Sequence, residues 1–253
     1  MIHLKSNREI EMIRASCRIA AEAMLRVLEK VTPGVTTLEL DQVADSYIRR
    51  QRGIPSAKDY RGFPRSICVS VNEVVVHGIP GERVLQEGDI LAVDIAAKSD
   101  GYHGDMNVST GVGAVAPEAQ RLLDTTRQAM EIGLQEARPG RRLGDLGHAI
   151  QSYAEAQGYS IVREYCGHGL GRSFHEEPQV LHFGQAGAGR RLESGMVFTV
   201  EPMVNQGGPE VRVLEDGWTA VTQDGRLSVQ FEHTVAVTRD GPDILSRFAD
   251  LPF

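Results

Sequence analysis

The chain has 253 residues, of which 41% are apolar and 24% are charged, and its formal net charge at pH 7 is −7. These values are ordinary for a compact protein in water, and a chain of this length can bury the core of one large domain or two small ones. The negative charge excludes nucleic-acid binding through a general basic surface. The N-terminus carries charges throughout and no apolar run reaches membrane-spanning length, so we expect no signal peptide, no membrane contact and a cytoplasmic location.

The first part of the chain predicts two amphipathic helices. An S-x-x-E start signal at Ser6 is followed by apolar residues at helical spacing as far as Pro33-Gly34. The same signal recurs at Thr36, and a second apolar stripe runs to Gly53. We therefore expect one long helix and one shorter helix, each stopped by a glycine.

Residues 66–113 differ in composition, because they are rich in β-branched residues and interrupted by Gly and Pro. This composition is typical of antiparallel strands and hairpins. A turn at 99–101 separates Asp94 from Asp105, so we expect these two acids on adjacent strands.

The same order of segments then recurs, which indicates an internal duplication. Three pairs of segments align in one order: 30–53 with 136–158, 68–80 with 166–178, and 85–94 with 192–201. One such alignment of turn residues is common, but three in the same order are not easily chance. We predict a single domain, 1–253, built from two related halves of about 1–115 and 116–253.

Four acidic residues are predicted to meet near the axis between these halves. Asp94 and Glu201 occupy matching places in the repeat, each at the end of an apolar, strand-like run. Asp105 lies on the neighbouring strand, and Glu232 is set in SVQFEHTVAV, which we predict to be a final strand. The simplest alternative is that each acid marks a strand end in solvent. Four carboxylates in an apolar sheet would repel one another unless cations neutralise them, and two divalent ions match their charge.

One histidine breaks the symmetry of the repeat. His168 stands where the first half has Ser70, which places one imidazole beside the acids. A set of four carboxylates and one histidine favours Mn, Fe(II), Co, Mg or a catalytic Zn over a thiolate zinc site. Two such ions can activate a water between them and polarise a carbonyl.

A second pair of histidines, His77 and His175, falls at matching places in the repeat and is not needed as metal ligands. We expect both to hydrogen-bond a substrate and the oxyanion that develops on it. A lone histidine more often has a structural role, but a matched pair favours function.

Five motifs span most of the chain, in this order: NEVVVHGIP (72–80), VDIAAKSDGYHGD (93–105), YCGHGLGRSFHEEP (165–178), FTVEPM (198–203) and QFEHT (230–234). Together they resemble the type 1 methionine aminopeptidases of the bacterial form that has no N-terminal extension. The resemblance implies the α+β pita-bread fold, in which two pseudo-twofold-related α/β halves form a central, curved antiparallel sheet. It also implies a dinuclear metal site between the halves.

The resemblance assigns each metal ligand a role. Asp94 would chelate one ion, His168 and Glu201 would bind the other, and Asp105 with Glu232 would bridge both. The two divalent ions would be Co, Mn, Fe(II) or Zn.

The implied activity is removal of the initiator methionine from nascent proteins and peptides when the second residue is small, by way of a metal-bridged water. Glu201 would act as general base toward that water. His77 would contact the amide that follows the methionine, and His175 would contact the scissile carbonyl oxygen. The chain's own Met1 precedes the bulky Ile2, so we expect Met1 to be retained.

The methionine pocket implied by the resemblance is apolar. Here it would be lined by Tyr60, Phe63, Cys68, Phe174 and Trp218. The chain departs from the family at RGF (61–63), where we expect a histidine and a tyrosine in place of Arg61 and Phe63. The pocket thereby loses a hydroxyl and gains a guanidinium near its rim, which affects specificity rather than the chemistry.

The resemblance further implies a cytoplasmic monomer that acts on nascent polypeptides, with transient ribosome contact and no sequence-specific nucleic-acid binding. Two alternatives stay open. A proline-directed pita-bread peptidase, such as a prolidase, usually carries an N-terminal domain that this chain is too short to contain. A non-catalytic pita-bread binding protein would have lost metal ligands, whereas all five are present here.

Overall fold

The computed structural model describes residues 2–249, so Met1 and residues 250–253 lie outside the described residues. The helices are α1 (Asn7–Leu28), α2 (Thr37–Arg50), α3 (Pro117–Glu136) and α4 (Leu143–Ala156), with a short 3₁₀ helix η1 at Tyr60–Gly62. The strands of the first half are β1 (Ile54–Pro55), β2 (Cys68–Val71), β3 (Val74–Val76), β4 (Ile90–Ser99) and β5 (Tyr102–Gly111). Those that follow are β6 (Ser160–Ile161), β7 (Gly167–Gly169), β8 (Glu176–Val180), β9 (Val197–Val200), β10 (Met203–Asn205), β11 (Val211–Val213), β12 (Ala220–Thr222), β13 (Ser228–Gln230), β14 (Glu232–Thr238) and β15 (Gly241–Ile244).

Both predicted helix starts are confirmed. At α1, the Ser6 hydroxyl accepts from the Glu9 N–H at 3.4 Å and the Glu9 carboxylate accepts from the Ser6 N–H at 2.9 Å. Thr36 and Glu39 form the same reciprocal pair at α2, at 3.2 and 2.7 Å. Each pair satisfies two N–H groups that the helix itself leaves free. α1 ends before the predicted Pro-Gly stop, because the next residues form a turn that bonds to carbonyls three positions back.

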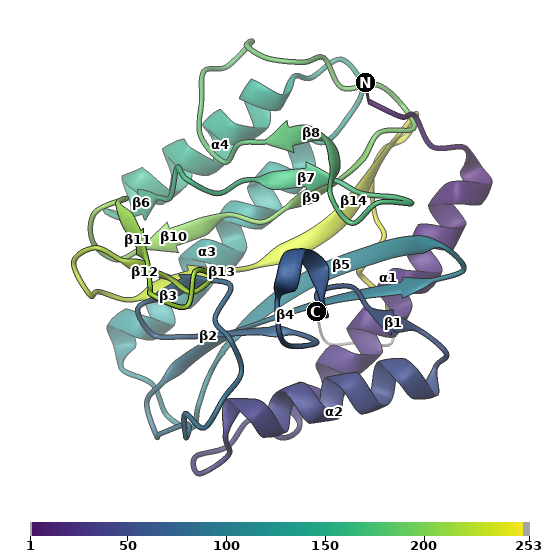
Figure 1. The fold of residues 1–253 in the computed structure, drawn as a ribbon. Coiled ribbons are helices and arrows are strands. Elements are labelled where there is room, and N and C mark those ends of the chain that lie inside the picture. The colour runs from purple at the N-terminus through teal and green to yellow at the C-terminus, as the bar shows by residue number, and fades with distance from the viewer. Residues whose placement is uncertain (1, 250–253) are drawn as a thin grey trace.

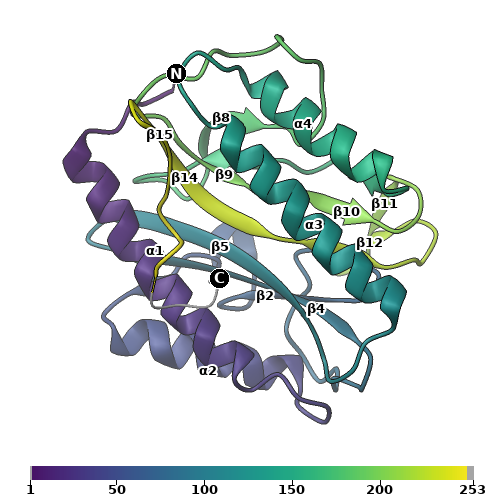
Figure 2. The same ribbon diagram turned by 180° about the vertical axis from the view of Figure 1, so that it is seen from behind.

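The central element is a curved nine-stranded sheet (Figure 1). Its strands follow the order β1-β4-β5-β14-β9-β7-β8, with β2 beside β4 and β15 beside β14, and its described pairings are antiparallel. Helices α1, α3 and α4 lie across one face of this sheet (Figure 2). The α+β class with a curved antiparallel sheet is therefore confirmed.

The segment that contains Glu232 differs from its prediction. Instead of one final strand, the chain forms β13 in a small sheet with β10 and β6, and then β14 in the large sheet. Phe231 separates the two strands, and β15 follows them. The prediction of one strand was wrong because the alternation of apolar and polar residues continues across Phe231. The alternation carries no sign that the residues before Phe231 join the small sheet and those after it join the large sheet.

The two predicted halves share a local pattern of hydrogen bonds. Leu85 exchanges two backbone bonds with residues 34–35, both at 2.8 Å, and Leu192 exchanges the corresponding bonds with residues 140–141, at 2.8 and 3.4 Å. The glycines at 34 and 140 have φ values of 95° and 91°, a region that favours glycine. These observations support the duplication, while the boundary near residue 115 stays a prediction.

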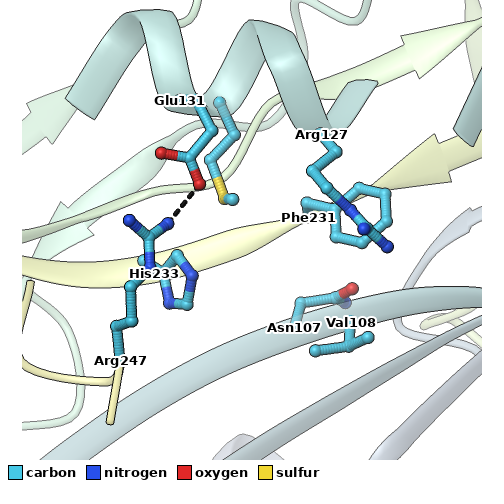
Figure 3. Close-up of a pocket in the computed structure, with 8 residues that line it drawn as sticks. Asn107, Val108, Arg127, Glu131, Phe231, His233 and Arg247 are labelled. Carbon is cyan, nitrogen blue, oxygen red and sulfur yellow. Dashed lines mark hydrogen bonds and ion pairs between the residues drawn. The ribbon is translucent and has the colours of Figure 1, made fainter. Parts of the chain in front are cut away.

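The helix-covered face of β14 holds a small cavity of about 190 Å³ (Figure 3). Glu131 of α3 forms an ion pair with Arg247 there, and the Arg127 guanidinium lies 4.9 Å from the centre of the Phe231 ring. Since side chains alternate along a strand, Glu232 points to the opposite face. The predicted carboxylate cluster must therefore lie on the face away from α3.

Within residues 2–249, no helix is both long enough and apolar enough to cross a membrane.

Candidate active site

Strand register brings the four predicted acids to one face of the sheet. Asp94 on β4 pairs with Asn107 on β5, which pairs in turn with Glu232 on β14. β14 also pairs with β9, and the last pair of this ladder joins His233 to Val200. One position further along both strands, Glu232 lies beside Glu201. Asp105 lies two positions before Asn107 and therefore faces the same way. The carboxylates gather on the face that α1 and α3 leave free.

His168 reaches this cluster from β7. Its N–H donates to the Thr199 hydroxyl at 2.9 Å, which fixes β7 against β9. Its Nε2 lies 3.7 Å from Asp105 Oδ2 and 3.8 Å from Glu201 Oε1. Nδ1 donates to the Gly169 carbonyl at 3.0 Å, and burial lowers the pKa of His168 to about 4. The ring is therefore neutral, with the lone pair of Nε2 directed at the acids.

Burial changes the protonation of the acids. Asp105 and Glu232 are only 3% and 1% exposed, and burial, followed by repulsion from neighbouring carboxylates, holds their pKa well above the usual range. Burial also raises the pKa of Asp94 to about 7 and that of Glu201 to about 8. Within the described part of the chain, no Lys or Arg pairs with any of the four. Without a metal, this site must hold protons to limit its charge.

The cluster has the features of a cation site. One ligand atom from each of Asp105, His168 and Glu232 lies within 4.8 Å of the others. Asp105 Oδ1 and Glu232 Oε1 are buried and accept no hydrogen bond from the described residues. Unpartnered buried oxygens are rare in folded proteins, and a cation would satisfy both. Carboxylate oxygens with one imidazole fit a divalent ion.

The acids lie in a cavity of about 630 Å³. Every predicted site residue lines it: His77, Asp94, Asp105, His168, His175, Glu201, Glu232, Tyr60, Phe63, Cys68, Phe174 and Trp218. The structure thus brings together residues from both halves of the chain, although their individual roles stay predictions.

The two additional histidines, His77 and His175, both line this cavity. The centre of the His175 ring lies 4.0 Å from the centre of the His168 ring. The centre of the His77 ring lies 6.2 Å from the centre of the Trp218 ring. His77 has a φ of 59°, a left-handed conformation that is uncommon outside glycine and is concentrated at functional sites. Burial lowers the pKa of His77 to about 4, and burial with nearby cationic groups lowers that of His175 to about 3. Both rings are neutral at pH 7 and can each donate one N–H.

The sequence matches the model of metallopeptidase family M24 over residues 11–239. The chain belongs to this family. Membership of a metallopeptidase family implies a divalent metal cofactor, in agreement with the unpartnered carboxylates of the site.

Relatives of this M24 chain give a closer comparison. It is 50% identical to methionine aminopeptidase A of Synechocystis over 97% of both chains. It is 49% identical to methionine aminopeptidase 1 of Bacillus subtilis, over 98% of this chain and 100% of that one. The crystal structure of methionine aminopeptidase from Rickettsia prowazekii superposes with a TM-score of 0.96 at 44% identity, over 98% of this chain and 100% of the other. The resemblance to methionine aminopeptidases that the motifs predicted is confirmed.

The prolidase fold is shared more distantly. Prolidase from Pyrococcus furiosus superposes with a TM-score of 0.78 at 21% identity, and the match covers 97% of this chain but 65% of the prolidase. This likeness shows a common fold alone. The proline-directed alternative is therefore not favoured.

The apolar wall of the M24 cavity is built from aromatic contacts. Tyr60 meets Phe174 edge-on at 5.1 Å and stacks on His175 at 5.0 Å, and Phe63 meets Trp218 edge-on at 5.2 Å. The remaining wall residue, a cysteine on β2, has its thiol pKa raised well above the usual value by burial, so the thiol stays neutral. These side chains suit an unbranched apolar group.

Arg61 is exposed and lines the edge of the cavity. It has a φ of 49°, and its guanidinium lies 5.4 Å from the centre of the Tyr60 ring. Phe63 is 3% exposed. Its ring carries no hydroxyl, so this part of the cavity wall is fully apolar.

Four polar residues that hold the acids were missed by the sequence analysis. The Thr199 hydroxyl and the Gln230 amide donate to the two oxygens of Glu201, at 2.6 and 3.1 Å. Asn107 Nδ2 donates to the Gln230 side-chain oxygen Oε1 at 2.9 Å, and His182 Nε2 accepts from the Glu201 N–H at 3.1 Å. Three of them stand two positions from an acid in the same motif, as in T-V-E, Q-F-E and D-M-N, so strand alternation could have identified them. His182 carries no comparable signal.

Proposed function

We propose that this chain is a methionine aminopeptidase that removes the N-terminal methionine from polypeptides whose second residue is small. The observation that carries the proposal is the cluster of buried, unpartnered carboxylates beside His168, in a cavity that also has an apolar wall. Nascent polypeptides are the corresponding substrates.

Five residues would hold two divalent ions. We assign Asp94 to one ion, His168 and Glu201 to the other, and Asp105 with Glu232 to both. Two ions would neutralise the four acids, and they would supply a Lewis acid and lower the pKa of a water held between them. Their identity among Co, Mn, Fe(II) and Zn is part of the proposal to be tested.

Glu201 would serve as general base. Its carboxylate is held from both oxygens by Thr199 and Gln230, so it cannot rotate away from the site. It would take the proton of the attacking water and pass it to the leaving amine. A bound cation would lower the pKa of Glu201 from about 8. The carboxylate would then be ionised at neutral pH and able to accept that proton.

The two neutral histidines would bind the scissile peptide. His175 would donate an N–H to the scissile carbonyl oxygen, where negative charge develops in the transition state. His77 would contact the amide that follows the methionine. Because each ring carries one proton at pH 7, neither adds charge to the site.

The aromatic wall would take the methionine side chain. Tyr60, Phe63, Phe174 and Trp218, together with Cys68, offer an apolar surface and no charged partner, which favours an uncharged, flexible thioether. The second residue would lie beside His77 and His175, where a large side chain would compete with the rings for space.

The test is release of methionine from Met-Ala-Ser by metal-stripped protein, before and after addition of Mn, Fe(II), Co or Zn. We expect metal-restored release from Met-Ala-Ser and none from Met-Ile-Ser. A folded protein that is inactive with every metal would contradict the proposal. Cleavage of a dipeptide that ends in proline, at a rate above that of Met-Ala-Ser, would favour the prolidase alternative.

Transient ribosome contact, a monomeric state and a cytoplasmic location accompany this proposal as predictions. A non-catalytic binding role is not favoured, because all five proposed ligands are present and line one cavity.

A further inference from the structure

The N-terminal segment before α1 packs against the strands that carry the active site. The Lys5 N–H donates to the Gly195 carbonyl at 2.7 Å, in the turn before β9. The Lys5 ammonium donates to Glu176 Oε2 at 2.5 Å, at the start of β8 and 171 positions away in the chain. We infer that Lys5, through this ion pair, positions His175 for the reaction. The inference rests on the role proposed above for His175 at the scissile carbonyl.

The ion pair is unusually enclosed for a lysine. The Lys5 side chain is 3% exposed and that of Glu176 is 19% exposed. A Cβ added to Gly171 would lie 2.7 Å from Lys5 Cε, so the β7–β8 loop (residues 170–175) packs directly on the lysine stem. A buried ammonium that loses its anion is strongly unfavourable, so each partner fixes the other.

The carboxylate of Glu176 connects the lysine to the loop. Its second oxygen, Oε1, accepts from the Ser173 N–H at 3.1 Å. The Ser173 carbonyl accepts from the Gly171 N–H at 3.2 Å, and the Gly171 carbonyl accepts from the His103 N–H at 2.8 Å. The loop is thus held by a chain of hydrogen bonds that begins at Lys5.

The other side of the β7–β8 loop faces the active site. Phe174 stacks on His103 at 5.5 Å, and His175 contacts the rings of His168 at 4.0 Å and Tyr60 at 5.0 Å. His175 keeps an exposed surface although its ring is partly buried by these contacts, so side-chain packing alone does not fix its position. The loop backbone must do so, and the backbone depends on the pair formed by Lys5. A displacement of about 1 Å in a catalytic group can cost roughly 100-fold in rate.

The test begins with Lys5→Met, which keeps most of the stem and removes the ammonium. We expect kcat for Met-Ala-Ser to fall by about 10- to 100-fold, with KM within about 3-fold, because the metal ligands and all residues of the methionine pocket except Phe174 lie outside the β7–β8 loop. The control is Lys30→Met, at an exposed lysine beyond the end of α1, which should change neither value. Methionine release by the unmodified protein tests the proposed function, whereas the ratio of variant to unmodified kcat tests this inference.

A double-mutant cycle separates positioning from general damage. In the His175→Ala background, Lys5→Met should lower kcat by less than about 3-fold, since the group that it positions is gone. Equal losses in both backgrounds would overturn the inference, as would a Lys5→Met variant with unchanged kcat.

Two further measurements keep the inference testable if Lys5→Met folds poorly. Glu176→Gln retains the side-chain shape and the acceptor for Ser173, and we expect the same selective loss of kcat. Amide hydrogen exchange in the metal-free protein should show faster exchange confined to the N-terminal segment and the β7–β8 loop. Unchanged protection of that loop would contradict the inference independently of activity.

Discussion

The hydroxyl of Thr199 donates a 2.6 Å hydrogen bond to Glu201 Oε1 and accepts a 2.9 Å hydrogen bond from the backbone N–H of His168. One threonine thus fixes both residues proposed to bind the same ion. The bond to the carboxylate favours its charged form and so opposes the rise in its pKa that burial causes.

Thr199→Val keeps the shape of this side chain and removes both hydrogen bonds. We expect kcat/KM for Met-Ala-Ser to fall by about 10-fold or more, since a hydrogen bond to a charged group contributes roughly 1.5–3 kcal/mol. The acidic limb of the pH–rate profile should also move to higher pH, because Glu201 loses a bond that lowers its pKa. Thr110→Val is the matched control, because the Thr110 hydroxyl on β5 donates to the carbonyl of the next residue, Gly111, at 3.4 Å. An unchanged rate and profile would contradict the assigned role.

Asp105→Asn and Glu232→Gln each remove one of the buried, mutually repelling acids. We expect both variants to lose metal-restored methionine release while the metal-free protein stays folded, and unfolds at an equal or higher temperature at pH 8. Circular dichroism during heating, with Asp240→Asn as an exposed control, measures the stability. Near-normal turnover in either variant would exclude a bridging role for that residue.

The metal-free protein should lose stability as pH rises from 7 to 9. The pKa of Asp94 is raised to about 7 and that of Glu201 to about 8, from 3.8 and 4.5. The folded state therefore binds protons more tightly than the unfolded state, and the corresponding stability is lost as pH passes through the raised values. Buried histidines act in the opposite direction only below their ordinary pKa of 6.5, outside this range.

The measurement is a urea titration of metal-free protein at several pH values between 7 and 9. Added Mn(II) should restore stability at pH 9, because the cation replaces the lost protons. A metal-free protein whose stability rises or stays constant over this range would contradict the prediction.

His175→Ala should lower kcat by about two to three orders of magnitude, the usual effect of removing one partner of a developing oxyanion. His148→Ala, at an exposed position on α4, provides the control. A loss seen only in KM would mean that His175 binds the substrate without stabilising the transition state.

The specificity can also be checked on the protein itself. Met1 is followed by Ile2, whose branched side chain should prevent removal of the methionine. Intact-mass measurement of the protein should give a chain that begins with Met1, whereas a chain that begins with Ile2 would contradict a requirement for a small second residue.

The sequence by itself determined the local elements and the chemical identity of the site. The signals at Ser6 and Thr36 act within one helical turn, so they specify the starts of α1 and α2 wherever those helices pack. The four acids could be identified because a charged side chain in an apolar strand is costly to bury unless a cation neutralises it. His168 could be identified because it lies in a glycine-rich segment at the place where the first half has a serine. The repeat then indicated that they meet.

The tertiary structure alone decided how the site is held. The change from the small sheet of β13 to the large sheet of β14 occurs at Phe231, and the sequence hides it because the apolar alternation continues across that residue. Lys5 meets Glu176 only because the N-terminal segment lies beside β8. Such contacts depend on strand register and on packing between segments far apart in the chain, and residue spacing within one segment carries no information about either.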